Sequence, residues 1–415
     1  MIYNQIIHIW LILNYITTVF MLYQLSISLA AFRSKKYVIP PDIHQHRFAA
    51  LIAARNEEKV IGSLIKSIKE QNYPQDLIDI IVIADNCDDD TAEVARRAGA
   101  IVYDRFNKNE VGKGYVLKFV FEKIFSERDV YDAFCVFDAD NLVEKDFFAH
   151  MNYALSNGAQ LAQGYRDMKN PSDNWIAGGH SIFYWMENRF FDYARDEMGL
   201  SAIINGTGFM VTSDYIRSYG YNVHTVTEDV ELTVQSVING KRVAWVPQAK
   251  VYDEQPVTLS QSMAQRSRWV SGFIQNSRDY FKEFCHSIRR EPTWIKIDLF
   301  LYLVSLPVMI LGIISFLIYS VLALFNIFAV LSSIVNTLWL IAGTLGVFWL
   351  IGFASVFMES KDIKSMLKSI LMNPVFNATW GIIWCKCFFV HDNKWTPIVH
   401  NCNVTLDEID GTGQK

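Results

Sequence analysis

The chain has 415 residues, of which 51% are hydrophobic and 20% charged, and its formal net charge is −5. This apolar share is too high for an ordinary soluble enzyme, while the charged share requires a polar part beside an apolar one. The negative net charge offers nothing to neutralise a phosphate backbone, so nucleic acid is excluded as an expected partner. The six cysteines show neither disulfide nor zinc spacing, and we expect free thiols.

The first predicted element is a membrane anchor. Residues 6–32 are almost all apolar and carry no formal charge, and they are long enough to cross a hydrocarbon core of about 30 Å. A signal peptide would begin with positive charges, which this segment lacks. Arg33, Lys35 and Lys36 follow at once, and the positive-inside rule places this end of the helix in the cytoplasm. We therefore assign residues 1–36 to an N-terminal transmembrane helix.

Residues 45–285 are predicted to form a cytoplasmic α/β domain. Short apolar runs, separated by helical and polar stretches, indicate buried strands at residues 48–54, 78–84, 101–103 and 134–137. Buried strands that alternate with helices favour a mainly parallel sheet covered on both faces. Ligands bind such sheets at the carboxyl ends of the strands, which is where the polar residues lie, and we expect a nucleotide-binding domain.

Residues 292–390 are predicted to return to the membrane. Residues 299–325 and 329–357 are each long enough to span it and carry no formal charge, and Asn326 suits the turn between them. Residues 369–390 contain Pro374 and several polar residues, so a helix lying in the cytoplasmic interface is favoured over a full span. Residues 391–415 would form a cytoplasmic tail. These elements predict a multi-pass protein of the plasma membrane, with the α/β domain inserted between transmembrane helices.

Acidic residues follow the second apolar run, at positions 85–90. An EF-hand loop would need glycine at its sixth position and glutamate at its twelfth, where this chain has Asp90 and Arg96. A calcium loop is therefore excluded. Asp88 to Thr91 suit the start of a helix, whereas Asp85, at the end of the strand, is placed to hydrogen-bond a base or ribose.

Asp138-Ala139-Asp140 follows the fourth apolar run. Alternation along an extended segment points both carboxylates the same way, so they can share a divalent cation and a ribose hydroxyl. Mg²⁺ and Mn²⁺ favour sites of one or two carboxylates completed by substrate phosphates. A lone Asp-x-Asp is frequent by chance, but its position after a buried strand favours a metal site.

Two later clusters each allow a structural and a catalytic interpretation. Thr227-Glu228-Asp229 precedes a predicted helix. In the structural interpretation its acidic residues stabilise the first turn of that helix, and in the catalytic interpretation Asp229 is a general base. Gln265-Arg266-Ser267-Arg268-Trp269 suits an interfacial helix with Arg and Trp at the membrane surface. It also suits a substrate site, since Arg268 can bind pyrophosphate and Trp269 can face a sugar ring.

In this order, the clusters at Asp85, Asp138–Asp140, Thr227–Asp229 and Gln265–Trp269 resemble the pattern of the processive family-2 glycosyltransferases. These are the cellulose, chitin and hyaluronan synthases and their bacterial relatives, and the resemblance covers essentially the whole chain. It implies a GT-A domain that uses a UDP-sugar with Mg²⁺ or Mn²⁺ and inverts the anomeric carbon. It also implies that a growing polysaccharide leaves through the transmembrane helices, among membrane lipid. With about three spans, that channel is small or is completed by a second copy of the chain.

The resemblance assigns roles residue by residue. Asp229 would be the catalytic base, with Glu228 and Thr227 beside it. Trp269 and the loop Gly206-Thr207-Gly208 would contact the acceptor, and Asp140 with Asp138 would bind the metal. The residues that would bind the nucleotide sugar are Asp85, Asn56, Glu58, Lys113, Asp138, Gln265 and Arg268.

Donor and acceptor remain open at this point. UDP-glucose polymerised into a β-glucan is the first expectation, and UDP-N-acetylglucosamine giving a chitin-like or hyaluronan-like product is the alternative. A non-processive transfer to a lipid, such as a polyprenyl phosphate or ceramide, is also compatible with Gln-x-x-Arg-Trp. A transporter would place ionisable residues inside its spans, and residues 299–357 contain none. A catalytically dead relative would have lost a carboxylate, whereas all of the predicted ones are present.

Overall fold

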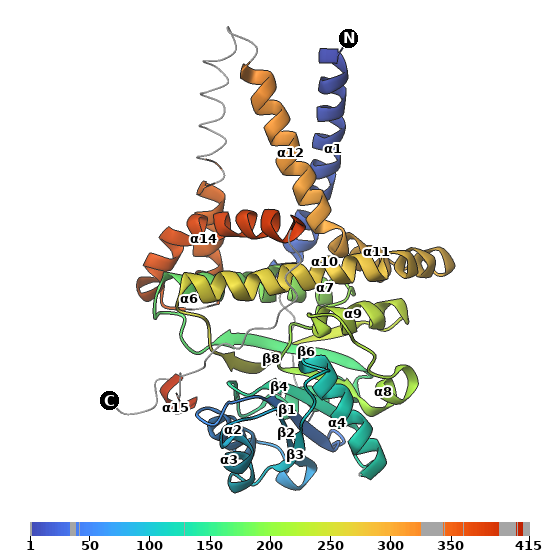
Figure 1. Cartoon of the computed structure of the whole chain (residues 1–415), viewed down its shortest axis with the longest axis vertical. Helices are drawn as coiled ribbons and strands as arrows, with labels where there is room; N and C mark the ends of the chain where they lie inside the picture. The colour runs from blue at the N-terminus through green and yellow to red at the C-terminus, as the bar shows by residue number, and fades with distance from the viewer. Residues whose placement is uncertain are drawn as a thin grey trace.

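The computed structural model of the chain describes residues 2–33, 39–40, 42–127, 129–324, 343, 345–359, 361–389, 404 and 406–409. Three parts follow one another along the long axis of the molecule (Figure 1). An α/β domain lies at one end, a layer of helices crosses the middle, and two long helices rise from that layer.

A mixed sheet forms the centre of the α/β domain, and its described strands have the order β3-β2-β1-β4-β7-β6-β8-β5. Strands β1, β2, β3 and β4 pair in parallel, whereas β7 runs antiparallel to both β4 and β6. Beyond β7 the sheet continues with a parallel β6–β8 pair and an antiparallel β5–β8 pair. The prediction of a mainly parallel sheet therefore holds for the first half only. The strands are β1 (Phe48–Ala54), β2 (Ile78–Asp85), β3 (Ile101–Arg105), β4 (Ala133–Asp138), β5 (Leu142–Val143), β6 (Leu161–Met168), β7 (Phe209–Thr212) and β8 (Val243–Asp253).

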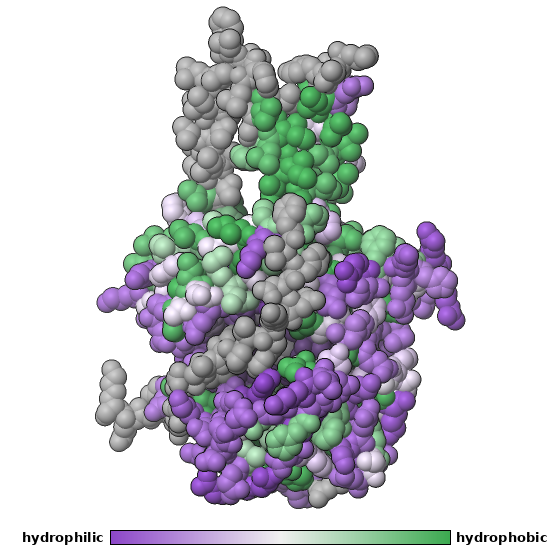
Figure 2. Space-filling model, viewed as in Figure 1, coloured by the Kyte–Doolittle hydropathy of each residue, from purple (hydrophilic) through white to green (hydrophobic). Residues whose placement is uncertain are grey.

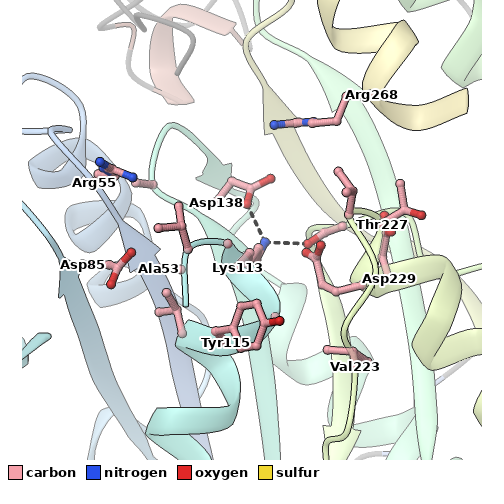
Figure 3. A pocket seen from close by; sticks show the side chains of 18 of the residues that line it. Ala53, Arg55, Asp85, Lys113, Tyr115, Asp138, Val223, Thr227, Asp229 and Arg268 are labelled. Carbon is pink, nitrogen blue, oxygen red and sulfur yellow. Dashed lines mark hydrogen bonds and ion pairs between the residues drawn. The ribbon is translucent and has the colours of Figure 1, made fainter. Parts of the chain in front are cut away.

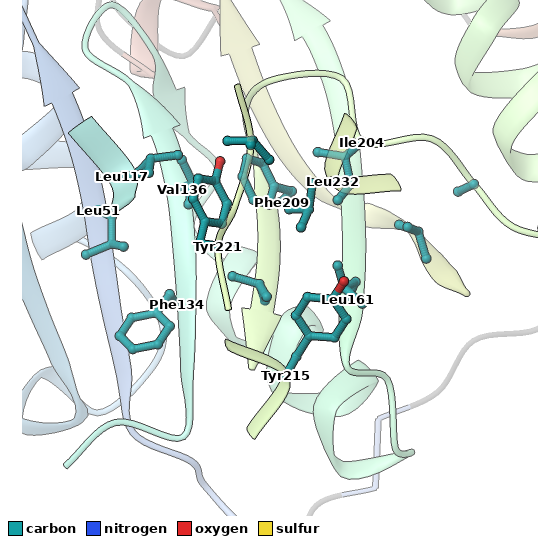
Figure 4. Packing of buried hydrophobic residues seen from close by; sticks show 14 of the residues in the cluster. Leu51, Leu117, Phe134, Val136, Leu161, Ile204, Phe209, Tyr215, Tyr221 and Leu232 are labelled. Atoms are coloured by element: carbon teal, nitrogen blue, oxygen red, sulfur yellow. The ribbon is translucent and has the colours of Figure 1, made fainter. Parts of the chain in front are cut away.

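Two apolar cores cover the two faces of this sheet. Alternation along β1 sends Leu51 to one face and Phe48 to the other. The first core packs α4 side chains such as Leu117 against Phe134 and Val136 (Figure 4), and the second packs α2 and α5 against the opposite face. The helices of the domain are α2 (Ile61–Lys69), α3 (Thr91–Arg97), α4 (Lys113–Glu127), α5 (Phe147–Ser156), α8 (Ser213–Tyr219) and α9 (Glu228–Ile238), with a short 3₁₀ turn at η2 (Gln75–Leu77). A second 3₁₀ turn, η1 (Leu29–Phe32), lies outside this domain, at the end of the first helix of the chain.

The helical layer contains the segment predicted to lie in the membrane interface. Its α14 packs on α6, and the contact is close because a Cβ at Gly179 would lie 2.5 Å from the Phe376 ring. The outer side of α14 leaves large apolar side chains exposed, among them Leu367, Leu371 and Ile382. The layer consists of α6 (Trp175–Met186), the π-helical turn η3 (Glu187–Tyr193), α7 (Ala194–Glu197), α10 (Leu259–Arg290), α11 (Trp294–Leu303) and α14 (Ile363–Phe389).

The rising helices are α1 (Ile2–Ser28) and α12 (Ser305–Leu324). Figure 2 shows apolar side chains gathered over them, and mainly hydrophilic side chains over the α/β domain. Within the described part of the chain, Gln5–Phe32 is the one unbroken helix long and apolar enough to cross a membrane. The first of the two predicted C-terminal spans is not straight, because α11 and α12 meet at 51°. Pro307 lies in the first turn of α12, and proline cannot donate to the preceding turn and so favours a break there.

The remaining C-terminal predictions fall largely outside the described residues. Of the predicted span over residues 329–357, the structure describes an apolar helix at Leu345–Met358, and the turn predicted at Asn326 lies outside the described part. Of the predicted tail, the short helix α15 (Leu406–Ile409) is described, and Leu406 packs against Leu142 and Tyr252 at the edge of the sheet.

Candidate active site

A cavity of about 320 Å³ opens at the carboxyl ends of β1, β2 and β4 (Figure 3). The strand order explains this position, since β1 lies between β2 and β4 and their carboxyl ends share one edge. A volume of this size is at the lower end of the range for small-molecule sites. Most of the residues that the sequence singled out line it, namely Asp85, Lys113, Asp138, Asp140, Gly206, Thr227, Glu228, Asp229, Gln265, Arg268 and Trp269.

Asn56 and Glu58 are not brought into the cavity, whose wall instead includes their neighbours Arg55 and Glu57. Asn56 turns the chain with a φ of +59°, a left-handed conformation that asparagine tolerates. The Oδ1 atom of Asn56 accepts a hydrogen bond from the Asp88 N–H at 2.9 Å, and a carboxylate oxygen of Glu58 accepts one from the Asp90 N–H at 3.1 Å. Both side chains therefore tie the loop after β1 to the loop after β2.

Thr207 and Gly208 lie behind the cavity wall, whereas Gly206 lines it. The buried Thr207 hydroxyl donates to Asn141 and accepts the Asp138 N–H at 3.1 Å. Gly208 has a φ of +63°, and a Cβ there would lie 2.7 Å from Val251. These two residues thus support the end of β4 rather than face a substrate.

Lys113 connects the two sides of the cavity. Its Nζ donates to Asp138 Oδ1 at 2.5 Å and to the Gly206 carbonyl at 2.7 Å (Figure 3). The α4 helix begins at this lysine, directly after Gly112, whose φ is +134°. A cation is thereby held between a carboxylate of the Asp-Ala-Asp segment and the loop that faces Asp229.

Asp138 and Asp140 fit a divalent cation site that a substrate completes. Both line the cavity, and Asp140 is only 4% exposed, with Oδ2 accepting the Glu254 N–H at 3.3 Å. Two carboxylates with substrate phosphates are a usual ligand set for Mg²⁺. The described residues contain no group of three or more His, Cys, Asp or Glu placed to hold a metal. A cation here would therefore take its other ligands from substrate and water.

Glu228 and Asp229 stand at the N-terminus of α9, deep in the cavity. Burial raises the pKa of Asp229, while the Val230 N–H, Lys113 and Arg166 act in the opposite direction. Burial and the neighbouring Asp229 together raise the pKa of Glu228 to about 7. A carboxylate whose pKa is raised toward neutrality is a better proton acceptor than an ordinary one.

The Gln-x-x-Arg-Trp segment lies on α10 and forms the opposite wall. Arg268 extends over the cavity in Figure 3. The Trp269 ring stacks on Phe183 of α6 and on Trp380 of α14, with centroid distances of 6.5 and 6.4 Å. Trp269 is therefore shared by the cavity and the aromatic contacts of the helical layer.

Two buried ion pairs near the cavity were not predicted from the sequence. Arg166 and Asp253 both line it, and Nε of the arginine donates to the carboxylate at 2.9 Å. Arg105 lies behind Asp85 and donates to its Oδ1 at 2.6 Å. The sequence signal that could have indicated them is a charged residue inside or at the end of an apolar strand, because a buried charge requires a partner of opposite charge. The sequence does not say which residue that partner is.

Residues 45–272 match the family model described as "Glycosyltransferase like family 2". The probable glycosyltransferase YdaM of Bacillus subtilis is 25% identical over 356 residues, which cover 83% of this chain and 82% of that protein. The beta-monoglucosyldiacylglycerol synthase of Synechocystis is 26% identical over 270 residues, or 61% of this chain and 53% of that protein. The chain thus matches most of the first relative and about half of the second.

Among solved structures, the mannosyltransferase PcManGT from Pyrobaculum calidifontis, in complex with GDP-Man and Mn²⁺, aligns with a TM-score of 0.58. The sequences are 14% identical, and the alignment covers 89% of this chain and 99% of that one. At this identity the likeness concerns the fold. The predicted GT-A-like α/β fold is confirmed, with a mixed rather than mainly parallel sheet.

Proposed function

This chain belongs to the glycosyltransferase-like family 2 and is a glycosyltransferase, and we propose that it transfers one sugar from a UDP-sugar to the hydroxyl of a membrane lipid. One observation carries the choice of acceptor. Trp269 lines the cavity and also stacks on α6 and α14. The acceptor end of the cavity thus adjoins the layer from which the apolar α1 and α12 rise (Figure 1).

The donor is proposed to lie along the carboxyl edge of the sheet. Asp85 would bind the nucleoside, and Asp138, Asp140, Lys113 and Arg268 would surround the diphosphate. Gln265, which lines the same wall, would bind the donor beside Arg268. A divalent cation held by Asp140 and Asp138, Mn²⁺ or Mg²⁺, would supply Lewis-acid charge there. Lys113 and Arg268 would offset the negative charge that grows on the departing UDP.

Asp229 is proposed to be the base. It would accept the proton of the acceptor hydroxyl while that oxygen bonds to the anomeric carbon and the bond from this carbon to UDP breaks. Attack from the side opposite UDP inverts the anomeric carbon, and no covalent enzyme intermediate is required. Gly206 leaves room for this approach, because a Cβ there would lie 3.3 Å from Asp229 Oδ2.

A lipid acceptor is supported by the helical layer and by one relative. Large apolar side chains on the outer side of α14 are exposed, and α1 is apolar enough to span a membrane. The Synechocystis relative is named for a glucosylated diacylglycerol. Neither of the curated relatives above is named as a polysaccharide synthase, so the order of motifs alone supports polymerisation. We propose that α1 anchors the chain, with the catalytic domain on the cytoplasmic side next to Arg33.

The test is a transfer assay on the full chain in lipid nanodiscs with Mn²⁺. The donors are UDP-glucose, UDP-N-acetylglucosamine, UDP-galactose, UDP-glucuronate and GDP-mannose. The acceptors are diacylglycerol and ceramide, which offer a hydroxyl, a polyprenyl phosphate, which offers only a phosphate oxygen, or none. We expect UDP release that depends on one of the two hydroxyl-bearing lipids, a product that carries a single sugar, and loss of both with a chelator. Release that depends on the polyprenyl phosphate instead would contradict transfer to a hydroxyl. High-molecular-weight product that forms without added lipid and is cut by a β-glucanase would establish polymer synthesis instead.

A further inference from the structure

The carboxylate of Asp85 is held on one side by two donors. Arg105 Nη1 donates to Oδ1 at 2.6 Å, and Asn86 Nδ2 donates to the same oxygen at 3.0 Å. The side chains of Arg105 and Asp85 are only 4% and 6% exposed. Both bonds go to Oδ1, so neither occupies Oδ2, while Asp85 itself lines the cavity (Figure 3).

Arg105 is itself fixed in place. Its Nη1 donates to the Glu110 carbonyl at 3.0 Å, and its Nη2 lies 3.3 Å from a carboxylate oxygen of the same residue. The Arg105 carbonyl accepts the Asn86 N–H at 2.8 Å. A guanidinium is a permanent cation with a rigid fork of donors. The Asp85 carboxylate is therefore presented to the cavity in one orientation, as a hydrogen-bond acceptor.

We propose that Arg105 is a positioning residue for the nucleotide: by fixing Asp85 as an acceptor, it selects a base with a ring N–H beside a carbonyl. Uracil, with its N3–H, and guanine, with its N1–H, have this chemistry. Cytosine has an unprotonated N3 instead, and the same pose would set its lone pair against the carboxylate. This inference rests on the proposed function, because it takes the cavity to bind a nucleoside diphosphate sugar.

The test is calorimetric binding of UDP, GDP, CDP and inorganic pyrophosphate to the full chain with Mn²⁺. We expect UDP or GDP to bind more tightly than CDP, and the comparison of UDP with GDP identifies the base. Arg105→Gln should weaken the binding of the preferred nucleotide by about 10- to 100-fold, which is the usual effect of losing a hydrogen bond to a charged group. Pyrophosphate affinity should stay unchanged. In turnover, KM for the donor should rise while kcat at saturating donor stays within about threefold.

Two variants separate positioning from general damage. Asp85→Asn should lower the ratio of UDP to CDP affinity, because an amide can donate to the N3 of cytosine. Arg105→Lys keeps the charge and should recover part of the lost affinity. The matched control is Arg96→Gln, which removes an exposed ion pair with Asp104, the residue before Arg105, and should bind nucleotides as the unchanged chain does.

The outcomes distinguish the inference from the proposal beneath it. A chain that binds no nucleoside diphosphate would overturn the proposed function. If the chain binds UDP and GDP no better than CDP, the role of Arg105 is overturned while the proposed function stands. The same holds if Arg105→Gln weakens the binding of pyrophosphate as much as it weakens the binding of the nucleotide. If Arg105→Gln does not fold, Arg105→Lys and Asp85→Asn decide, because unchanged nucleotide ratios in both would reject the proposal.

Discussion

Asp229 gives the most direct test at the scale of single residues. In the unchanged chain, Asp229 Oδ1 accepts the Val230 N–H at 2.8 Å. In Asp229→Asn the side chain keeps its size, and its amide oxygen can still accept this hydrogen bond. The amide can no longer take the proton from the hydroxyl of the sugar acceptor. We expect sugar transfer to fall by about 10²- to 10⁴-fold, while calorimetry shows donor affinity within about threefold of the unchanged chain. Transfer that stays within tenfold would show that another group takes the proton.

Burial of Asp229 should set the acidic limb of the pH profile. A base acts when deprotonated, so its raised pKa makes kcat/KM fall with decreasing pH above the range of an ordinary aspartate. Burial and the negative charge of Asp229 raise the pKa of Glu228 to about 7, so Glu228 ionises after its neighbour and is neutral over that limb. Glu228→Gln should therefore leave the acidic limb of the kcat/KM profile in place. A limb that moves to lower pH would show that Glu228 is charged while Asp229 titrates.

What the sequence could predict of the site follows from where each residue stands. Asp85 and Asp138 end apolar strands, and such positions are recognisable from the strand alone. Arg166 is different, because it lies inside β6 and its partner Asp253 comes 87 positions later. Its role exists only once β6 and β8 lie side by side, and a single sequence contains no signal for that pairing.

The same limit appears at the scale of elements. Strands β1, β2 and β4 were predicted closely because each is a mainly apolar run buried along almost its whole length. Strand β3 is partly exposed, and only its apolar first residues were predicted. Strand β6 is buried along its whole length yet contains Gln163, Arg166 and Asp167. These residues are satisfied by side-chain hydrogen bonds, so the strand does not appear as an apolar run. Strand β6 was not predicted for this reason.

The contact between α6 and α14 can be tested at Gly179. Gly179→Ala would place a Cβ 2.5 Å from the Phe376 ring, and overpacking of this kind costs about 1–3 kcal/mol. The control is Gly381→Ala on α14, where nothing lies within 4 Å of the added atom, and where alanine should be neutral or stabilising by up to about 1 kcal/mol. Thermal unfolding in detergent compares the two. Equal midpoints would mean that the helices are not held at this distance.

At the scale of the whole molecule, α1 is more than a tether. Tyr23 donates to Asp298 Oδ1 at 3.0 Å, and Gln24 accepts from Arg195 Nη2 at 2.9 Å. Arg195 and Asp298 form an ion pair in which both side chains are 2% exposed. These contacts join α1, α7 and α11, next to the π-helical turn that leads back to α6. The apolar helix α1 and the helical layer therefore share a buried polar network.

Breaking that network should destabilise the chain far more than breaking a surface ion pair. Arg195→Gln leaves the buried Asp298 carboxylate without its cation, which typically costs about 3–5 kcal/mol. The matched control is Arg217→Gln, whose arginine is 44% exposed and pairs with Asp129 and Asp214, and which should cost at most about 1 kcal/mol. Denaturant unfolding in detergent measures both. If the two variants lose the same stability, α1 acts as an independent anchor, and a chain without residues 1–28 should then keep its fold.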